Sequence, residues 1–154
     1  MNPVEYETVR IEKTTKVCPY CEGYAQKQAS KPIVVMSCEG GCLRGEVARR
    51  AANMLCSELA PEKTARLCLG GAFTKDTGQR ALARNATHLV VIEGCFIECA
   101  TRMMKGVVPS LEPEVVIADR LYDFDRNLFG IEEMPESDLN KHAREVAMAI
   151  AARL

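Results

Sequence analysis

The residues in this sequence best suited to chemistry are its eight cysteines. Six of them form pairs three or four residues apart: Cys18 with Cys21, Cys38 with Cys42, and Cys95 with Cys99. Thiolates bind soft metal ions and act as nucleophiles in redox reactions. Eight cysteines in 154 residues is a lower content than that of small secreted disulfide scaffolds. We therefore expect free or metal-bound thiols in a reducing compartment.

The elements that carry these cysteines are predicted to be strands alternating with helices. Short runs rich in β-branched residues predict strands at 33–36, 65–69, 88–92 and 114–118. Apolar residues at helical spacing predict helices over 43–59, 74–86 and 96–105, and from about 137 to the C-terminus. Such alternation is typical of an α/β fold, so we predict an open, mainly parallel four-stranded sheet in the order 2-1-3-4, with helices on both faces. Residues 1–30 are predicted to be an N-terminal arm and 31–154 a single domain.

Five cysteines are predicted to meet at one edge of this sheet. Cys38 follows the first strand, Cys68 lies at the end of the second and Cys95 follows the third, while Cys42 and Cys99 each come four residues after a strand-end cysteine. Because the carboxyl ends of parallel strands converge where such sheets bind ligands, we expect these thiols to lie together. The sequence therefore predicts a metal site at this edge.

The spacing within two of the pairs suits the start of a helix. Cys95 at a helix cap and Cys99 in the first turn would lie one above the other, and Cys38 and Cys42 could do likewise. Zn²⁺ accepts four thiolates, which leaves a net charge of about −2, and we expect Arg44 and Arg102 to offset it. Five candidate thiols leave three alternatives open: one is a spare, one ligand exchanges, or the site holds an iron–sulfur cluster.

Three motifs in this order resemble the DGC-domain family, whose members are described as putative zinc-binding proteins. They are the segments 37–42 (SCEGGC), 68–71 (CLGG) and 91–95 (VIEGC) followed by Cys99, and the resemblance spans 33–119. It implies a zinc site made by Cys38, Cys68, Cys95 and Cys99, with Cys42 an addition found in part of the family. The family takes its name from an Asp-Gly-Cys motif, and here Glu93 stands in place of Asp. The resemblance implies no established reaction.

The remaining candidate residues have weaker assignments. The pair Cys18 and Cys21 could be half of a zinc knuckle or a redox dithiol, and the sequence leaves both readings open. Cys56 is predicted to be a buried thiol in the helix over 43–59. His88, at the start of a strand, is expected to pack or to face solvent, and His142 is expected to be solvated on the polar face of the last helix.

Composition limits the classes of partner. The formal net charge is −1, aromatic residues make up 5% and tryptophan is absent, so we expect no nucleic-acid partner. No apolar stretch approaches a membrane span, and the polar start is unlike a signal peptide, so we expect a cytoplasmic protein. Residues 112–138 carry nine acidic and two basic side chains, and this acidic segment is either solvated or a surface for a partner.

Two functions remain after this reading. The first is a zinc-binding protein that handles metal or sulfur through the thiolates at the sheet edge. The alternative is an enzyme in which one of these thiols carries out redox or persulfide-transfer chemistry. The sequence contains no phosphate-binding loop, dinucleotide fingerprint or zinc-protease motif to favour another enzyme class.

Overall fold

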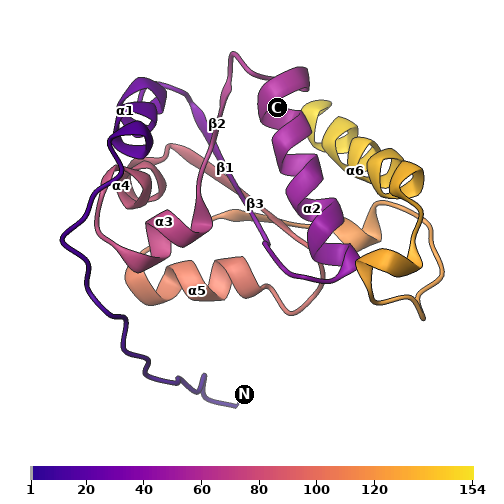
Figure 1. Cartoon of the computed structure of the whole chain (residues 1–154), viewed down its shortest axis with the longest axis horizontal. Coiled ribbons are helices and arrows are strands. Elements are labelled where there is room, and N and C mark those ends of the chain that lie inside the picture. The colour runs from indigo at the N-terminus through magenta and orange to yellow at the C-terminus, as the bar shows by residue number, and fades with distance from the viewer. Residues whose placement is uncertain (1) are drawn as a thin grey trace.

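The computed structural model describes residues 2–154 and contains one four-stranded sheet in that range. Its strands are β1 (Ile33–Ser37), β2 (Thr64–Arg66), β3 (His88–Glu93) and β4 (Glu114–Ile117). All pairings are parallel and the order is β2-β1-β3-β4, which confirms the predicted α/β class and strand order (Figure 1). β1 is buried along its whole length, as expected of a strand covered on both faces.

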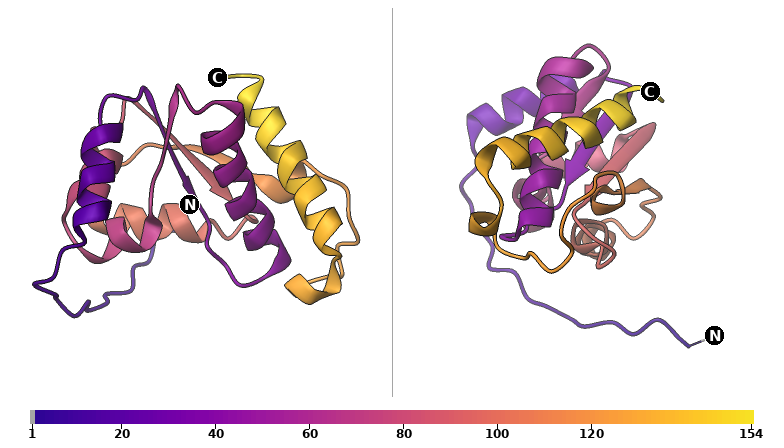
Figure 2. Two further views of the ribbon diagram at one scale, coloured as in Figure 1. Left: turned by 45° about the horizontal axis from the view of Figure 1, so that its top comes forward. Right: turned by 90° about the vertical axis from the view of Figure 1, so that its right-hand side faces the viewer.

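Helices cover both faces of the sheet and enclose two separate cores (Figure 2). One face packs against α2 (Leu43–Met54), which continues through a π-helical turn (Leu55–Leu59), and against α6 (Glu136–Ala151). The other face packs against α1 (Pro19–Gln28), α3 (Leu69–Thr74), α4 (Gly78–Asn85) and α5 (Cys99–Val107). Short 3₁₀ turns occupy Ala118–Arg120 and Ile131–Glu133.

Alternate residues of the strands supply the two cores. In β1, Ile33 and Val35 face α2 and α6, whereas Val34 and Met36 face the other helices. On the first face, Arg50 of α2 donates to the Glu136 carboxylate at 2.6 Å and so ties the start of α6 to α2. The sheet and its two helical layers thus hold the carboxyl ends of the strands at fixed positions.

The segment predicted to be an N-terminal arm contains irregular chain followed by a helix. Residues 2–18 form neither helix nor strand, but α1 follows within the range expected to be an arm. The α1 helix is docked on the domain because the Tyr24 hydroxyl accepts from the Arg66 backbone N–H at 2.9 Å, and Ala25 is buried. The pair of cysteines at the start of α1 is therefore attached to the fold rather than free.

Two other expectations met different outcomes. His88 is partly exposed and lies 2.7 Å from the Glu114 carboxylate, consistent with the expectation that it packs or faces solvent. His142 was expected to be solvated, but this was wrong: it is buried and stacks on Tyr122 with ring centroids 4.8 Å apart. Within residues 2–154, no helix is both long and apolar enough to cross a membrane.

Candidate metal centre

Three of the five candidate cysteines lie in loops at the same edge of the sheet. Cys38 directly follows β1, and Cys68 and Cys95 each come two residues after β2 and β3. Because β1 pairs with β3, the loops that carry Cys38 and Cys95 start side by side. The placement of these thiols at the carboxyl edge follows directly from the strand order.

Cys38 has the most enclosed sulfur of the group. The side chain is buried, and its Sγ accepts a hydrogen bond from the Gly40 backbone N–H at 3.3 Å and another from the backbone of Gly94. Burial raises the pKa of the Cys38 thiol, the two backbone hydrogen bonds lower it, and the nearby groups Glu93 and Cys99 raise it. The pKa of Cys38 is raised overall, so burial of the thiol outweighs the two backbone hydrogen bonds.

Cys68 lies in a more open position at the start of α3. Its Sγ accepts from the Gly71 backbone N–H at 3.4 Å, and its own backbone N–H donates to the Gln79 side chain at 3.0 Å. Gln79 is buried and also hydrogen-bonds the Cys21 thiol. Sequence reasoning missed Gln79, since nothing local marks a glutamine in α4 as a neighbour of two thiols.

Two candidate thiols flank the same glycine. A Cβ built on Gly40 would lie 3.3 Å from the Cys38 Sγ and 3.9 Å from the Cys42 Sγ. Across residues 2–154, no three His, Cys, Asp or Glu side chains are grouped in a way that could already hold a metal ion.

The helical spacing argument for the two pairs was wrong. Cys38 directly follows β1, and Cys42 is the N-cap of α2. Cys95 lies in a turn, and Cys99 is the first residue of α5. The turn before α5 passes through Glu98, whose φ of 55° is left-handed, so the helix begins three residues later than predicted. Each pair therefore joins a loop to a helix start and does not share one helical face.

Comparison with known protein families identifies one domain in this chain. A model of the DGC domain matches residues 34–147. The chain belongs to the DGC-domain family. Comparisons with curated proteins and with solved structures found no match. The matched range of the DGC domain contains the five edge cysteines and leaves Cys18 and Cys21 outside.

Glu93, in the sequence Glu93-Gly94-Cys95 that ends β3, has a structural role. Glu93 is buried, and its carboxylate accepts from the backbone N–H groups of Thr101 at 2.6 Å and Ala100 at 3.3 Å. A carboxylate stabilises a helix N-terminus by satisfying free N–H groups and by opposing the helix dipole. Glu93 thus fixes the start of α5, which carries Cys99.

Gly94 is required by the close approach of two backbones. A Cβ at this position would lie 2.8 Å from the Arg44 carbonyl carbon and 2.8 Å from the Gly45 nitrogen. Gly45 is equally confined, because its own Cβ would meet the Gly40 carbonyl oxygen at 2.6 Å. The turn after β3, the start of α2 and the loop after β1 are therefore packed backbone against backbone around Cys38.

The two arginines expected beside the thiols contact other groups. Arg44 donates to the Asp119 carboxylate at 3.2 Å and to the Leu128 carbonyl at 2.9 Å, and its guanidinium lies 4.9 Å from the Phe124 ring centre. Arg102 approaches the Ile97 carbonyl at 3.5 Å. Arg44 thus holds the acidic segment against α2, and Asp119 of that segment is buried instead of solvated.

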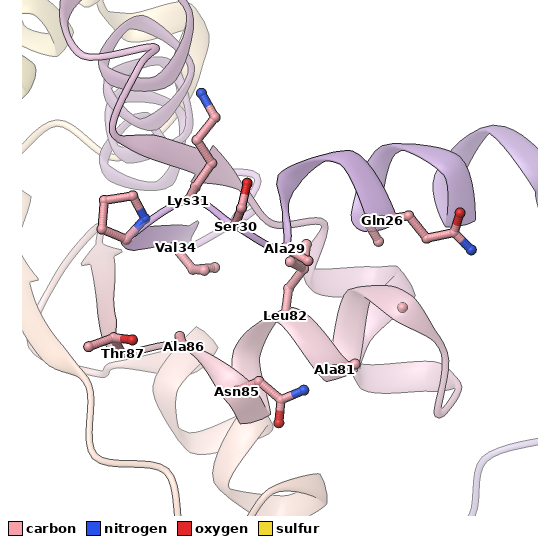
Figure 3. A pocket seen from close by; sticks show the side chains of 13 residues that line it. Gln26, Ala29, Ser30, Lys31, Val34, Ala81, Leu82, Asn85, Ala86 and Thr87 are labelled. Atoms are coloured by element: carbon pink, nitrogen blue, oxygen red, sulfur yellow. The ribbon is translucent and has the colours of Figure 1, made fainter.

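An open pocket of about 500 Å³ lies at the other end of the sheet (Figure 3). It is lined by α1, α4 and the residues that lead into β1 and β3, among them Ser30, Lys31, Leu82, Asn85 and Thr87. Its lining contains no cysteine, histidine or carboxylate. Cys38, Cys68 and Cys95 follow their strands at the opposite, carboxyl edge.

Proposed function

We propose that the chain is a zinc-binding protein whose ion is held by thiolates at the carboxyl edge of the sheet. The candidate ligands are Cys38, Cys42, Cys68, Cys95 and Cys99. The observation that carries this proposal is the environment of Cys38, where two backbone N–H groups point at a buried sulfur. Hydrogen bonds of this kind stabilise the sulfur of a metal-bound thiolate.

The side-chain types at this edge suit Zn²⁺, although the cysteine side chains are not grouped around one point. Thiolates are preferred zinc ligands, and the loops after β1 and β3 and the start of α3 can supply four. Because no three ligand-type side chains within 2–154 are yet grouped for a metal, binding requires the side chains on these loops to turn toward one another. Bound zinc would cross-link the loops and hold the thiols deprotonated. Gly40 and Gly94 would keep their N–H groups on the Cys38 sulfur.

The test is elemental analysis of the full chain purified without added metal. We expect about one zinc per chain, lost in Cys38→Ser and Cys99→Ser and retained in Cys56→Ser. Cys56 is a matched control because its partly buried thiol lies in the π-helical turn after α2, packed against the core. Zinc content that stays unchanged in Cys38→Ser would refute the proposal, and iron with visible absorption would replace it by the iron–sulfur alternative.

The pH dependence of zinc affinity provides a second readout. Each protonated thiol must lose its proton when zinc binds. Below the thiol pKa, zinc affinity should therefore fall about tenfold for each unit by which the pH is lowered, for every proton displaced. Burial raises the pKa of Cys38, and its proton should therefore be displaced throughout the range from pH 6 to 8. Competition titrations with a chromophoric chelator measure this slope, and a slope near zero would contradict thiolate ligation.

The same environment of Cys38 favours a second candidate, a persulfide-transfer enzyme. The Cys38 thiolate would attack the outer sulfur of a small persulfide R–S–SH, form Cys38–S–SH and release R–S⁻. The N–H groups of Gly40 and Gly94 would stabilise the sulfur anion in this step. Incubation of the zinc-free chain with such a persulfide, followed by mass spectrometry, should show a gain of one sulfur atom in wild type that Cys38→Ser lacks.

A further inference from the structure

The two cysteines at the start of α1 form a pair whose members have unequal surroundings. Cys18 is the helix cap and is exposed, whereas Cys21 lies three residues on and is partly buried. Residues at this spacing on a helix are neighbours, and their Cα atoms fall within the roughly 4.4–6.8 Å that a disulfide needs. We call Cys18 and Cys21 the arm dithiol.

The arm dithiol is held in place from both sides. After it, the Glu22 carboxylate accepts from the Gly78 backbone N–H at 3.1 Å, which fastens α1 to the start of α4. Before it, the Lys75 ammonium donates to the carbonyl oxygens of Thr14 at 2.8 Å and Lys16 at 3.0 Å. These contacts fix the position of the pair on the domain, and a fixed geometry favours closure of one particular disulfide.

The unequal surroundings assign different roles to the two thiols. The Cys18 side chain is exposed and makes no capping hydrogen bond, so a reagent can reach its sulfur. Cys21 is shielded, because its side chain is partly buried and the Gln79 side chain hydrogen-bonds it. An outside disulfide therefore reaches Cys18 first, and Cys21 is placed to attack Cys18 afterwards.

We propose that the arm dithiol is a thiol–disulfide exchange site for low-molecular-weight disulfides, with Cys18 as nucleophile and Cys21 as resolving thiol. The Cys18 thiolate attacks a disulfide R–S–S–R, forming Cys18–S–S–R and releasing one R–S⁻, which takes up a proton. Cys21 then loses its proton and attacks the Cys18 sulfur, which releases the second R–S⁻ and closes the Cys18–Cys21 disulfide. The substrate gains two electrons, and a low-molecular-weight thiol returns them by the reverse steps.

The experiment uses the full chain with glutathione disulfide as the probe and a chelator present. Tryptic peptide 17–27 contains both thiols of the arm dithiol and no other cysteine. In wild type we expect this peptide to become two hydrogens lighter and resistant to alkylation. In Cys21→Ser we expect one glutathione to accumulate on Cys18, and in Cys18→Ser we expect no modification of Cys21 on the same time scale. Cys56→Ser is the matched control and should behave as wild type.

Each other outcome overturns the proposal. Glutathione that appears equally on Cys21 in Cys18→Ser would remove the assigned roles, and wild type that stays as a mixed disulfide would remove the resolving step. The Cys38→Ser variant separates this proposal from the zinc proposal. It should lose zinc and still close the Cys18–Cys21 disulfide. Both substituted positions of the arm dithiol are at the surface start of α1, and unchanged circular dichroism verifies that the variants fold.

Discussion

Substitution of Gly94 by alanine tests whether close backbone packing builds the thiol edge. The added Cβ would lie 2.8–2.9 Å from three backbone atoms of Arg44 and Gly45, whereas ordinary contacts begin near 3.4 Å. Because those atoms belong to the start of α2, no side chain can rotate to make room, and the turn and the helix must separate by roughly 0.6 Å. Overpacking of this kind costs about 1–3 kcal/mol, and contacts with backbone place Gly94 at the upper end.

A smaller effect of opposite sign must be subtracted. Gly94 does not have a positive φ, so alanine can adopt its backbone conformation, and restricting the unfolded chain contributes about 0.4–1 kcal/mol of stability. The expected net loss is about 2 kcal/mol, which corresponds to a fall in Tm of about 4–8 °C for a chain of this length. Gly41→Ala is the control, because a Cβ there meets no atom within 4 Å.

The assay is urea unfolding of the chelator-treated chain, so that differences in zinc binding do not add to the unfolding free energy. We expect Gly94→Ala to unfold at lower urea concentration and Gly41→Ala to match wild type or exceed it slightly. If Gly94→Ala lies within about 0.5 kcal/mol of wild type, the turn after β3 is not confined by α2 and the packing argument is wrong.

Three further predictions concern charges and protons in the fold. Glu93→Ala should lose about 2–3 kcal/mol in the same urea assay, because two N–H groups at the start of α5 lose their carboxylate; unchanged stability would show that water replaces it. Arg44→Ala should cost about 2–3 kcal/mol and Arg44→Lys should recover little of it, since the buried Asp119 carboxylate would keep only Arg126 at 3.5 Å; full recovery by lysine would refute the role of the guanidinium. Burial raises the pKa of Cys38 and Cys56 above the ordinary 9.0. The zinc-free fold should therefore keep its full unfolding free energy below pH 9 and lose part of it as pH rises through the folded pKa values, because the buried thiols must then ionise. Equal urea midpoints at pH 8 and 10.5, measured with Cys56→Ala for comparison, would contradict this prediction.

The sheet could be predicted from the sequence because its strands carry a local signal. Ile33 to Met36 and Leu89 to Ile92 are short, continuous apolar runs rich in β-branched residues, which is typical of a strand covered on both faces. Strand order then followed from right-handed crossovers, and with it the placement of Cys38, Cys68 and Cys95 at one edge. These positions depend on topology alone.

Features set by distant contacts could not be predicted in the same way. The start of α5 was misplaced because the group that caps it, Glu93, lies in the preceding strand and reaches across a turn. The docking of α1 depends on Glu22 meeting Gly78, residues 56 positions apart. The apolar environment of His142 comes from Tyr122 on another segment. In each case the decisive partner lies outside the window in which periodicity is read.

The motif at 93–95 shows why a cluster of motif residues is not the same as a cluster of ligands. Glu93 caps a helix and Gly94 admits a neighbouring backbone, so only Cys95 of the three is free to bind an ion. Loss of zinc in a Glu93 or Gly94 variant would therefore report displaced loops, with a parallel loss of stability. Loss of zinc in Cys38→Ser or Cys99→Ser at unchanged stability of the zinc-free fold would instead report a lost ligand. Measuring both quantities on the same variants separates the residues that build the edge from those proposed to bind metal there.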